Sequence, residues 1–297
     1  MSHHALEGLE GVIIEPSTLF DQSGDMTRHH CSTRVRVALG TLVAVEAAHD
    51  ISASAAEAVV AAHEAIASVD RLLHPQNDGS DLARIRAAAL HSPVAVDAFT
   101  WDLLEFAKRL HALTRGVFDP SLPSREGRLD DLELSGDQDA PHVVCRKPVA
   151  LDFGGFAKGF AVDRAVDTLL THGCESGLVN AGGDMRVFGA REHVALLRRP
   201  DRSYEELPLA ASALAVSDVD AASRPPEHQG YYTRVAPLCL HQRYVAVRAT
   251  TATVADALAK CLLLCPPATG RELLRTFKAE CVSDASYPAL RHTRSAT

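Results

Sequence analysis

The stretch Leu151-Asp-Phe-Gly-Gly-Phe-Ala-Lys-Gly-Phe-Ala-Val-Asp163 joins an apolar strand candidate, a double-glycine turn and the start of a helix. The two glycines let the backbone approach a ligand closely, and the first turn of the helix offers amide N–H groups without intrahelical partners. Lys158, about one turn into the helix, adds a positive charge beside any phosphate bound there. Taken alone, such a stretch is more often a tight strand-to-helix turn with a solvated lysine.

The sequence on either side predicts an α+β fold with mixed or antiparallel sheets and packed helices. Apolar alternation and short apolar runs predict strands at 149–153, 177–181 and 244–248, and amphipathic faces predict helices at 156–172 and 253–264. Strands and helices follow one another without a regular βαβ period, which argues against a doubly wound parallel sheet. Residues 1–30 are polar and aperiodic, so we expect an irregular segment there and one folded domain over 31–297.

The composition excludes several classes of protein. The 297 residues are 46% apolar and 23% charged, which is typical of a globular chain with a sizeable core. A net charge of −8 argues against a nucleic-acid-binding protein. The longest apolar stretches, such as 257–264, are too short to span a membrane. The seven cysteines cannot all pair and the first ten residues lack a signal-peptide pattern, so we expect a cytoplasmic location.

Three further runs carry groups of chemical interest. Val179-Asn-Ala-Gly-Gly-Asp184 places small residues where a ligand or a second backbone passes close by, although a glycine-rich hairpin turn also explains it. In Thr250–Lys260, Asp256 lies among small apolar residues, where a buried carboxylate needs a cap, an ion-pair partner or a metal. Thr114-Arg-Gly-Val-Phe-Asp-Pro120 is typical of a helix stop followed by a turn.

In this order and at these separations, the four runs resemble the FAD:protein FMN transferase family (ApbE-like flavin transferases) over about residues 31–282. The resemblance implies a T-fold-like α+β architecture and a magnesium-dependent reaction. In that reaction FAD is split, FMN is attached to a Thr or Ser hydroxyl of an acceptor flavoprotein, and AMP is released. Phosphoryl transfer depends on positioning and charge neutralisation, and a hard divalent cation prefers oxygen ligands, so the residue types suit this chemistry.

The resemblance also assigns roles to single residues. The positions that match the family's FAD-binding elements are Cys31, Phe118, Asp119, Pro120, Asp152 and Lys158. The backbone of Gly155 and the carboxylate of Asp256 match the elements that hold magnesium. The acceptor flavoprotein is not identified by the sequence.

The chain departs from the family pattern in its second half. The threonine that follows the family's Ala-Asp-Ala-Leu motif is replaced by Lys260. The family's His-x-x-Asp-Pro-x-Thr-Gly element is absent from 230–238, where Arg234 stands near the expected histidine. These departures keep two alternatives open: a protein that binds a flavin nucleotide without transferring it, and an FAD hydrolase that gives FMN and AMP.

Two structural expectations follow. The side chains or turns expected to meet in one pocket are Asp119, Asp152, Gly154-Gly155, Lys158 and Asp256. Lys260 lies one helical turn after Asp256 and on the same helix face, so we expect it to pair with Asp256 or to occupy the cation position. A solvent-exposed Lys260 that leaves Asp256 free is the alternative.

Overall fold

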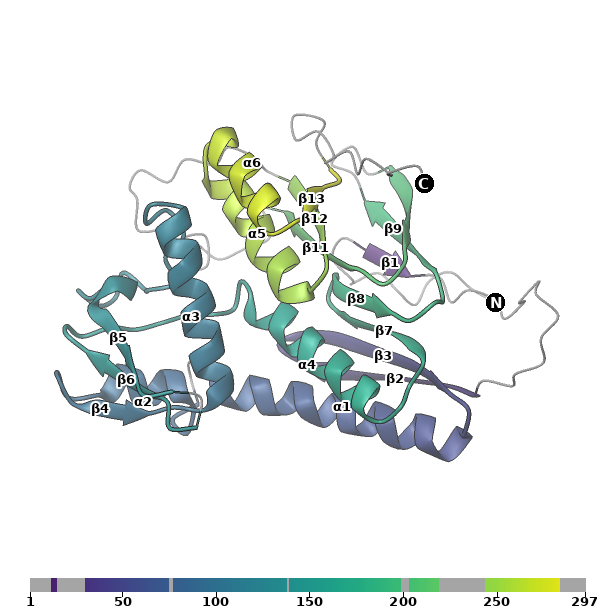
Figure 1. Cartoon of the computed structure of the whole chain (residues 1–297), viewed down its shortest axis with the longest axis horizontal. Helices are drawn as coiled ribbons and strands as arrows, with labels where there is room; N and C mark the ends of the chain where they lie inside the picture. The colour runs from purple at the N-terminus through teal and green to yellow at the C-terminus, as the bar shows by residue number, and fades with distance from the viewer. Residues whose placement is uncertain are drawn as a thin grey trace, which may run out of the picture.

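A seven-stranded sheet forms the centre of the computed structural model, which describes residues 12–14, 30–74, 77–137, 139–198, 203–218 and 244–283 (Figure 1). Its strands, in spatial order, are β13 (Glu280–Cys281), β12 (Tyr244–Ala249), β11 (Ala213–Asp218), β8 (Asp184–Phe188), β7 (Ser176–Ala181), β3 (Thr41–His49) and β2 (His30–Ala38). Every neighbouring pair in this sheet is antiparallel. The α+β prediction is therefore confirmed.

Successive side chains of a strand point to opposite faces of its sheet. In the inner strands of this sheet, the side chains on both faces are apolar. In β12, Val245 and Val247 belong to the main core, whereas Ala246 between them belongs to a second apolar cluster. In β11, Ala215 and Leu214 divide in the same way. The sheet is therefore the middle layer of the molecule and has a core on each side.

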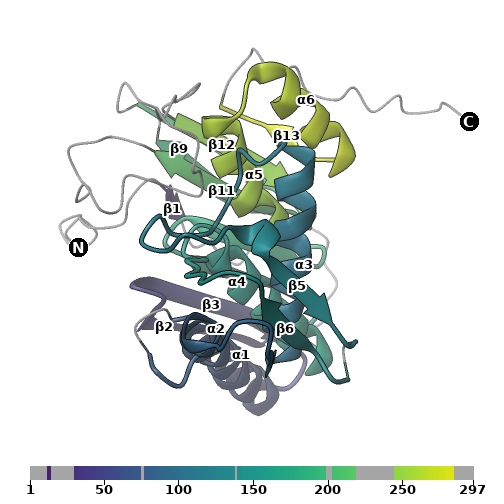
Figure 2. The same cartoon turned by 90° about the vertical axis from the view of Figure 1, so that its left-hand side faces the viewer.

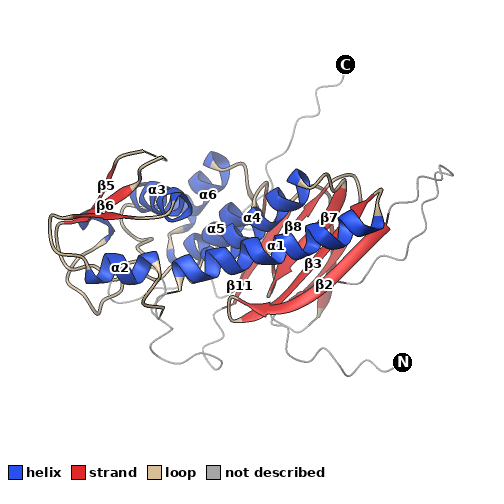
Figure 3. Cartoon of the chain, turned by 90° about the horizontal axis from the view of Figure 1, so that it is seen from below, coloured by secondary structure: helices blue, strands red, loops and turns tan. Residues whose placement is uncertain are grey.

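Three helices cover one face of the sheet (Figure 3). α1 (Ser52–Leu73) lies over β2 and β3, α4 (Ala157–Thr171) over β7 and β8, and α5 (Ala252–Leu264) over β11 and β12. α5 is buried along almost its whole length, and α6 (Pro267–Thr276) packs against it. The central helix α4 thus contacts both α1 and α5.

Two small sheets complete the fold. β1 (Val12–Ile14), β9 (His193–Arg198) and β10 (Tyr204–Leu209) form a three-stranded sheet, and apolar residues of β9 and β10 contribute to the second cluster. The other small sheet faces the viewer in Figure 2, together with two helices and a short 3-10 turn. These elements are β4 (Pro93–Ala95), β6 (His142–Cys145), β5 (Leu132–Ser135), α2 (Asp81–Ala87), α3 (Ala98–Leu113) and the turn Leu129–Asp131.

Four of the five predicted elements are confirmed, as β7, β12, α4 and α5. The predicted strand at 149–153 is wrong: the run is buried, but only Leu151 makes a bridge, to Ser121. Its backbone instead bonds to a neighbouring loop, since Leu122 donates to the carbonyl of Ala150 and Asp152 donates to that of Pro120. An apolar run can be enclosed by loops as completely as by a sheet, and its sequence does not distinguish the two.

The expectation of an irregular segment over 1–30 is wrong at 12–14. There the chain forms β1, which pairs antiparallel with β9 over Val12↔Leu197 to Ile14↔Ala195. Val12, Ile13 and Ile14 are all β-branched and so favour a strand, but the three residues are too few to give a periodic signal.

The two central helices approach each other closely at Gly159. A Cβ atom at this position would lie 2.3 Å from the carbonyl oxygen of Ala252 and 2.8 Å from the Cβ of Asp256. One turn further along α4, Asp163 accepts hydrogen bonds from the N–H groups of Ala252 and Thr253, at 2.9 and 2.8 Å. The side chain of Asp163 therefore caps the first turn of α5 from the neighbouring helix.

We predict that Gly159→Ala destabilises the protein by about 1–3 kcal/mol, because the added methyl group meets backbone atoms of α5 that cannot rotate away. Helix propensity alone favours alanine over glycine and would give the opposite sign. Urea unfolding followed by circular dichroism measures the difference. Gly79→Ala is the control, since its nearest neighbour for a Cβ is at an ordinary 3.4 Å. Equal or greater stability of Gly159→Ala would contradict the close contact.

Candidate functional site

The turn that follows α3 is held by its own polar groups. Arg115 and Gly116 have left-handed φ values of +53° and +80° and reverse the chain direction. The N–H of Phe118 donates to Thr114 Oγ1 at 3.0 Å, and its carbonyl accepts from His111 Nδ1 at 2.8 Å. Asp119, directly after, is buried in a defined position.

This turn lies alongside the stretch that leads into α4. The N–H of Asp152 donates to the carbonyl of Pro120 at 3.0 Å, and the ring centroids of Phe118 and Phe156 are 5.6 Å apart. Asp119 and Asp152 are far apart in the sequence but belong to these adjoining backbone segments. The tertiary fold thus combines two of the predicted site segments.

Asp152 shapes the double-glycine turn. Its Oδ1 accepts a hydrogen bond from the N–H of Gly154 at 2.7 Å, which closes a local turn and directs the chain into α4. The residue that precedes α4, Phe156, makes no side-chain cap for the first turn of the helix. Lys158 lies in that first turn with its side chain 28% exposed.

Two carboxylates and two ammonium groups meet beside the first turn of α4. Lys158 Nζ lies 2.6 Å from Asp184 Oδ2, at the start of β8. Asp256 pairs through Oδ1 with Lys260 Nζ, and its Oδ2 accepts the N–H of Gly159 at 3.0 Å. Both carboxylates are completely buried, whereas the Lys260 side chain is 11% exposed. The expected Lys260–Asp256 ion pair is confirmed.

Burial dominates the electrostatics of Asp256. Loss of solvation, reinforced by the nearby negative charge of Asp184, raises the pKa of Asp256 to about 6. The ammonium groups of Lys260 and Lys158 act in the opposite direction. Both oxygens of the carboxylate act as acceptors, one from the Lys260 ammonium and one from the N–H of Gly159.

The structure connects most of the predicted site residues. Asp119 and Pro120 adjoin Asp152, whose turn leads to Lys158, and the N–H next to Lys158 reaches Asp256. That these groups together bind one ligand stays a prediction. Lys158 and Asp256 do not lie on opposite faces of the molecule, since the N–H of Gly159, the residue after Lys158, donates to Asp256 Oδ2 at 3.0 Å.

The expected roles of Phe118 in FAD binding and of Gly155 in holding a metal stay predictions. The ring of Phe118 is fully buried against Phe156, and its N–H and carbonyl are both occupied, so its contacts are structural. The backbone group that reaches Asp256 is the N–H of Gly159, four positions beyond Gly155.

Cys31 lies apart from the other predicted residues. It pairs in register with Ala48, which pairs with Ser176 at the start of β7. Asp184 pairs with Ala181 at the other end of the same strand. Cys31 instead contacts Arg191, with Sγ 3.9 Å from Nη1, near the Arg191–Glu46 ion pair. Its position near one end of the sheet separates it from the four charged side chains at α4, namely Lys158, Asp184, Asp256 and Lys260, which we call the charged cluster.

No role for Asp184 or Asp163 was expected from the sequence. The Asn-Ala-Gly-Gly-Asp run is a hairpin, in which Gly182 and Gly183 have φ values of +61° and +97° and join β7 to β8. The signal that singled out Asp256, a carboxylate among apolar residues, also applies to Asp184 before Met185 and Val187. For Asp163 no local signal exists, because its partners belong to α5 and β8.

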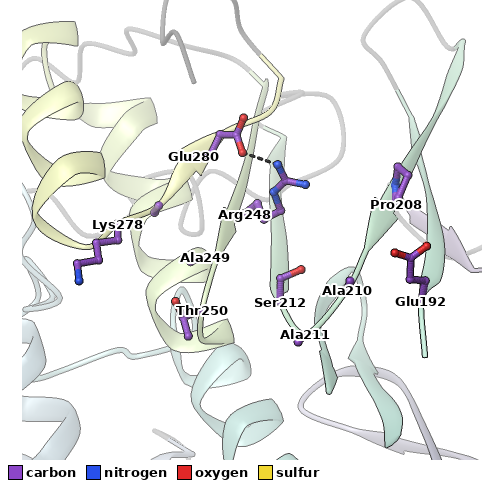
Figure 4. Close-up of a pocket in the computed structure, with 11 residues that line it drawn as sticks. Glu192, Pro208, Ala210, Ala211, Ser212, Arg248, Ala249, Thr250, Lys278 and Glu280 are labelled. Atoms are coloured by element: carbon purple, nitrogen blue, oxygen red, sulfur yellow. Dashed lines mark hydrogen bonds and ion pairs between the residues drawn. The ribbon is translucent and has the colours of Figure 1, made fainter. Parts of the chain in front are cut away.

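A cavity of about 530 Å³ lies elsewhere, between the ends of β11, β12 and β13 and the β9–β10 hairpin (Figure 4). Its charged lining includes Arg248 paired with Glu280, as well as Lys278 and Glu192. None of the predicted site residues lines it. The cavity is therefore distinct from the charged cluster at α4.

A sequence model described as the ApbE family matches residues 39–125 and 124–283 of the chain. The chain belongs to the ApbE family. It is 28% identical over 191 residues to the FAD:protein FMN transferase of Treponema pallidum, covering 54% of this chain and 52% of that protein. With the FAD:protein FMN transferase of Vibrio cholerae it shares 28% identity over 155 residues, covering 41% of this chain and 45% of that protein. The chain thus spans about half the length of the curated relatives it matches.

The fold is also that of solved ApbE structures. The apo form of the flavinyl transferase ApbE from Pseudomonas stutzeri superposes with a TM-score of 0.69, at 20% identity, over 88% of this chain and 93% of that one. At this level of identity the similarity establishes the fold of this ApbE family member and no more.

The residues at Asp256 do not fit the magnesium ion that the family resemblance implied. Both oxygens of Asp256 are occupied, one by an ammonium group and one by a backbone N–H. A magnesium ion prefers several oxygen ligands and is repelled by an adjacent ammonium group. Within the described ranges, no three His, Cys, Asp or Glu side chains gather in a way that could hold a metal ion.

In the same ranges no helix combines the length and the apolar character that crossing a membrane requires.

We predict that Asp163→Asn destabilises this ApbE family member by about 3 kcal/mol. The change removes the charge that pairs with Arg186 and turns an N–H₂ group toward the donors of α5. Thermal and urea unfolding measure the loss. Asp167→Asn is a control on the same helix, because its side chain is 43% exposed and its contact with Arg186 is longer, at 3.8 Å. Unchanged stability of Asp163→Asn would show that α5 does not need this cap.

Proposed function

We propose that this chain is an FAD:protein FMN transferase, which moves FMN from FAD to a Thr or Ser hydroxyl of an acceptor flavoprotein and releases AMP. Membership of the ApbE family supports the proposal, and two curated relatives carry this name. Because the chain spans about half of those relatives, the activity is proposed for it rather than carried over. A cytoplasmic acceptor is part of the same proposal.

The observation that carries the proposal is an unsatisfied acceptor at Asp119. This carboxylate is 1% exposed, its Oδ1 accepts the N–H of Ser121, and its Oδ2 has no hydrogen-bond partner within the described part of the chain. The hydroxyl of Ser121 is also buried without a partner. Buried polar atoms are nearly always paired, so these two groups point to a ligand that supplies hydrogen-bond donors.

FAD has groups that match this site. Its sugar and ribityl hydroxyls, its adenine amine and its ring N–H are donors for Asp119, and its pyrophosphate is a partner for Lys158. The ammonium of Lys158 and the positive N-terminal end of the α4 dipole supply charge for that pyrophosphate. The proposed reaction forms a bond between the acceptor oxygen and the FMN phosphorus and breaks the bridging P–O bond. AMP leaves with that electron pair on the bridging oxygen, and the proton of the acceptor hydroxyl is released to water.

A second candidate function is binding of a flavin nucleotide without transfer. The Lys260–Asp256 ion pair favours it, because the carboxylate is not available to a metal. The sequence at 230–238, where the family's His-x-x-Asp-Pro element is missing, agrees with it but lies outside the described residues. FAD hydrolysis, with water in place of the acceptor hydroxyl, remains the third outcome to be distinguished.

We predict that purified protein binds FAD and that Asp119→Asn and Lys158→Gln each weaken this binding at least about tenfold. Fluorescence quenching of FAD measures the affinity. Lys147→Gln is the matched control, since Lys147 is an exposed lysine paired with Asp131. Equal affinity of Lys158→Gln and the wild type would contradict the site assignment.

Product analysis distinguishes the three functions. The protein is incubated with FAD and an extract of soluble proteins from its source, once with magnesium and once with EDTA. AMP together with flavin fluorescence on a protein band in a denaturing gel indicates transfer. AMP with free FMN indicates hydrolysis, and bound FAD without AMP indicates binding alone. No FAD binding in either buffer rejects all three.

A further inference from the structure

Lys260 is buried in a place that does not suit a lysine. It lies in the middle of α5, where Leu258, Ala259, Cys261 and Leu262 are completely buried. Only 11% of its side chain is exposed. An ammonium group taken out of water at such a position is strongly destabilising unless it is paired.

The position is stabilised by Asp256, one helical turn earlier on the same face. The two groups are in direct contact through Nζ and Oδ1. The second oxygen of Asp256 accepts the N–H of Gly159, which is part of the close contact between α4 and α5. The cation and its partner are therefore both held by the packing of the two central helices.

The charged cluster contains equal numbers of positive and negative groups. Asp256 pairs with Lys260 and Asp184 pairs with Lys158, so two carboxylates face two ammonium groups. Each carboxylate is almost inaccessible to solvent, and each lysine reaches it from a helix on the same face of the sheet. A divalent cation at Asp256 would have to displace Lys260 or lie beside its positive charge.

We propose that the ammonium of Lys260 takes the place of a divalent cation at Asp256, so that this chain binds the pyrophosphate of FAD without a metal ion. The exclusion of the metal rests on the geometry alone, and only the identity of the anion rests on the proposed function. Lys260 neutralises the Asp256 carboxylate, which would otherwise repel the phosphates, and Lys158 together with the N-terminal end of α4 supplies the attraction for them.

The exclusion of the metal is tested with Mn²⁺ alone, in the absence of FAD. Free Mn²⁺ gives an electron paramagnetic resonance signal that is lost on binding, so titration yields an affinity directly. We expect the wild type to bind Mn²⁺ no better than Asp256→Asn, and Lys260→Thr to bind it at least about tenfold more tightly than either. The double variant Lys260→Thr/Asp256→Asn should lose this gain, because the carboxylate is the expected ligand.

Two further variants serve as controls for this comparison. Lys260→Met removes the charge while keeping an apolar stem, so it reports on the charge if Lys260→Thr does not fold, and it should also gain Mn²⁺ affinity. Lys147→Thr removes an exposed lysine and should leave the affinity unchanged. Mn²⁺ binding by the wild type that depends on Asp256 and equals that of Lys260→Thr overturns the proposal.

The second experiment compares FAD affinity in EDTA with that in magnesium. We expect equal affinities in the two buffers for the wild type. For Lys260→Thr we expect a loss of at least about tenfold in EDTA and recovery in magnesium. FAD binding by the wild type that requires magnesium overturns the proposal. If the wild type binds no FAD in either buffer, the proposed function and the FAD part of the inference fail, while the Mn²⁺ comparison still decides whether Lys260 excludes the metal.

Discussion

The close contact between α4 and α5 is the constraint on which the rest of the structure depends. At Gly159 the backbone of α4 lies directly against Ala252 and Asp256 of α5, and no side chain fits between them. Asp163 extends the contact by capping the first turn of α5 and by pairing with Arg186 of β8. Glycine and aspartate act together here, since the first allows the approach and the second fixes the relative positions of two helices and a strand.

This contact also builds the charged cluster. The N–H that α4 presents at Gly159 is the one that Asp256 accepts, so the helix packing determines where the buried carboxylate lies. Lys158 and Asp184 adjoin it because β8 starts under the first turn of α4. Removing one partner of such an ion pair leaves a buried carboxylate without its counter-charge, which is costly, so the cluster is a fixed part of the core as well as a candidate anion site.

The predicted elements show where sequence patterns are sufficient. The helices at 156–172 and 253–264 were predicted because each carries an apolar face long enough to bury. The strands β7 and β12 were predicted from apolar alternation and short apolar runs. The run at 149–153 failed because burial by the loop at 120–127 leaves the same apolar signature as burial in a sheet. The distance of Cys31 from the charged cluster follows from the register between β2, β3 and β7, which its local sequence does not indicate.

The sequence by itself determined the α+β class, the family resemblance, the double-glycine entry into α4 and the position of Lys260 on the same helix face as Asp256. Each of these depends on residues within a turn or two of one another, or on motifs in a fixed order. Only the tertiary structure decided that Asp119 adjoins Asp152, that Asp184 takes Lys158 as its partner, and that Asp163 caps α5. Such contacts join segments far apart in the chain, and their energy comes from desolvating charges in a packed interior, a condition that exists only once the helices and the sheet have assembled.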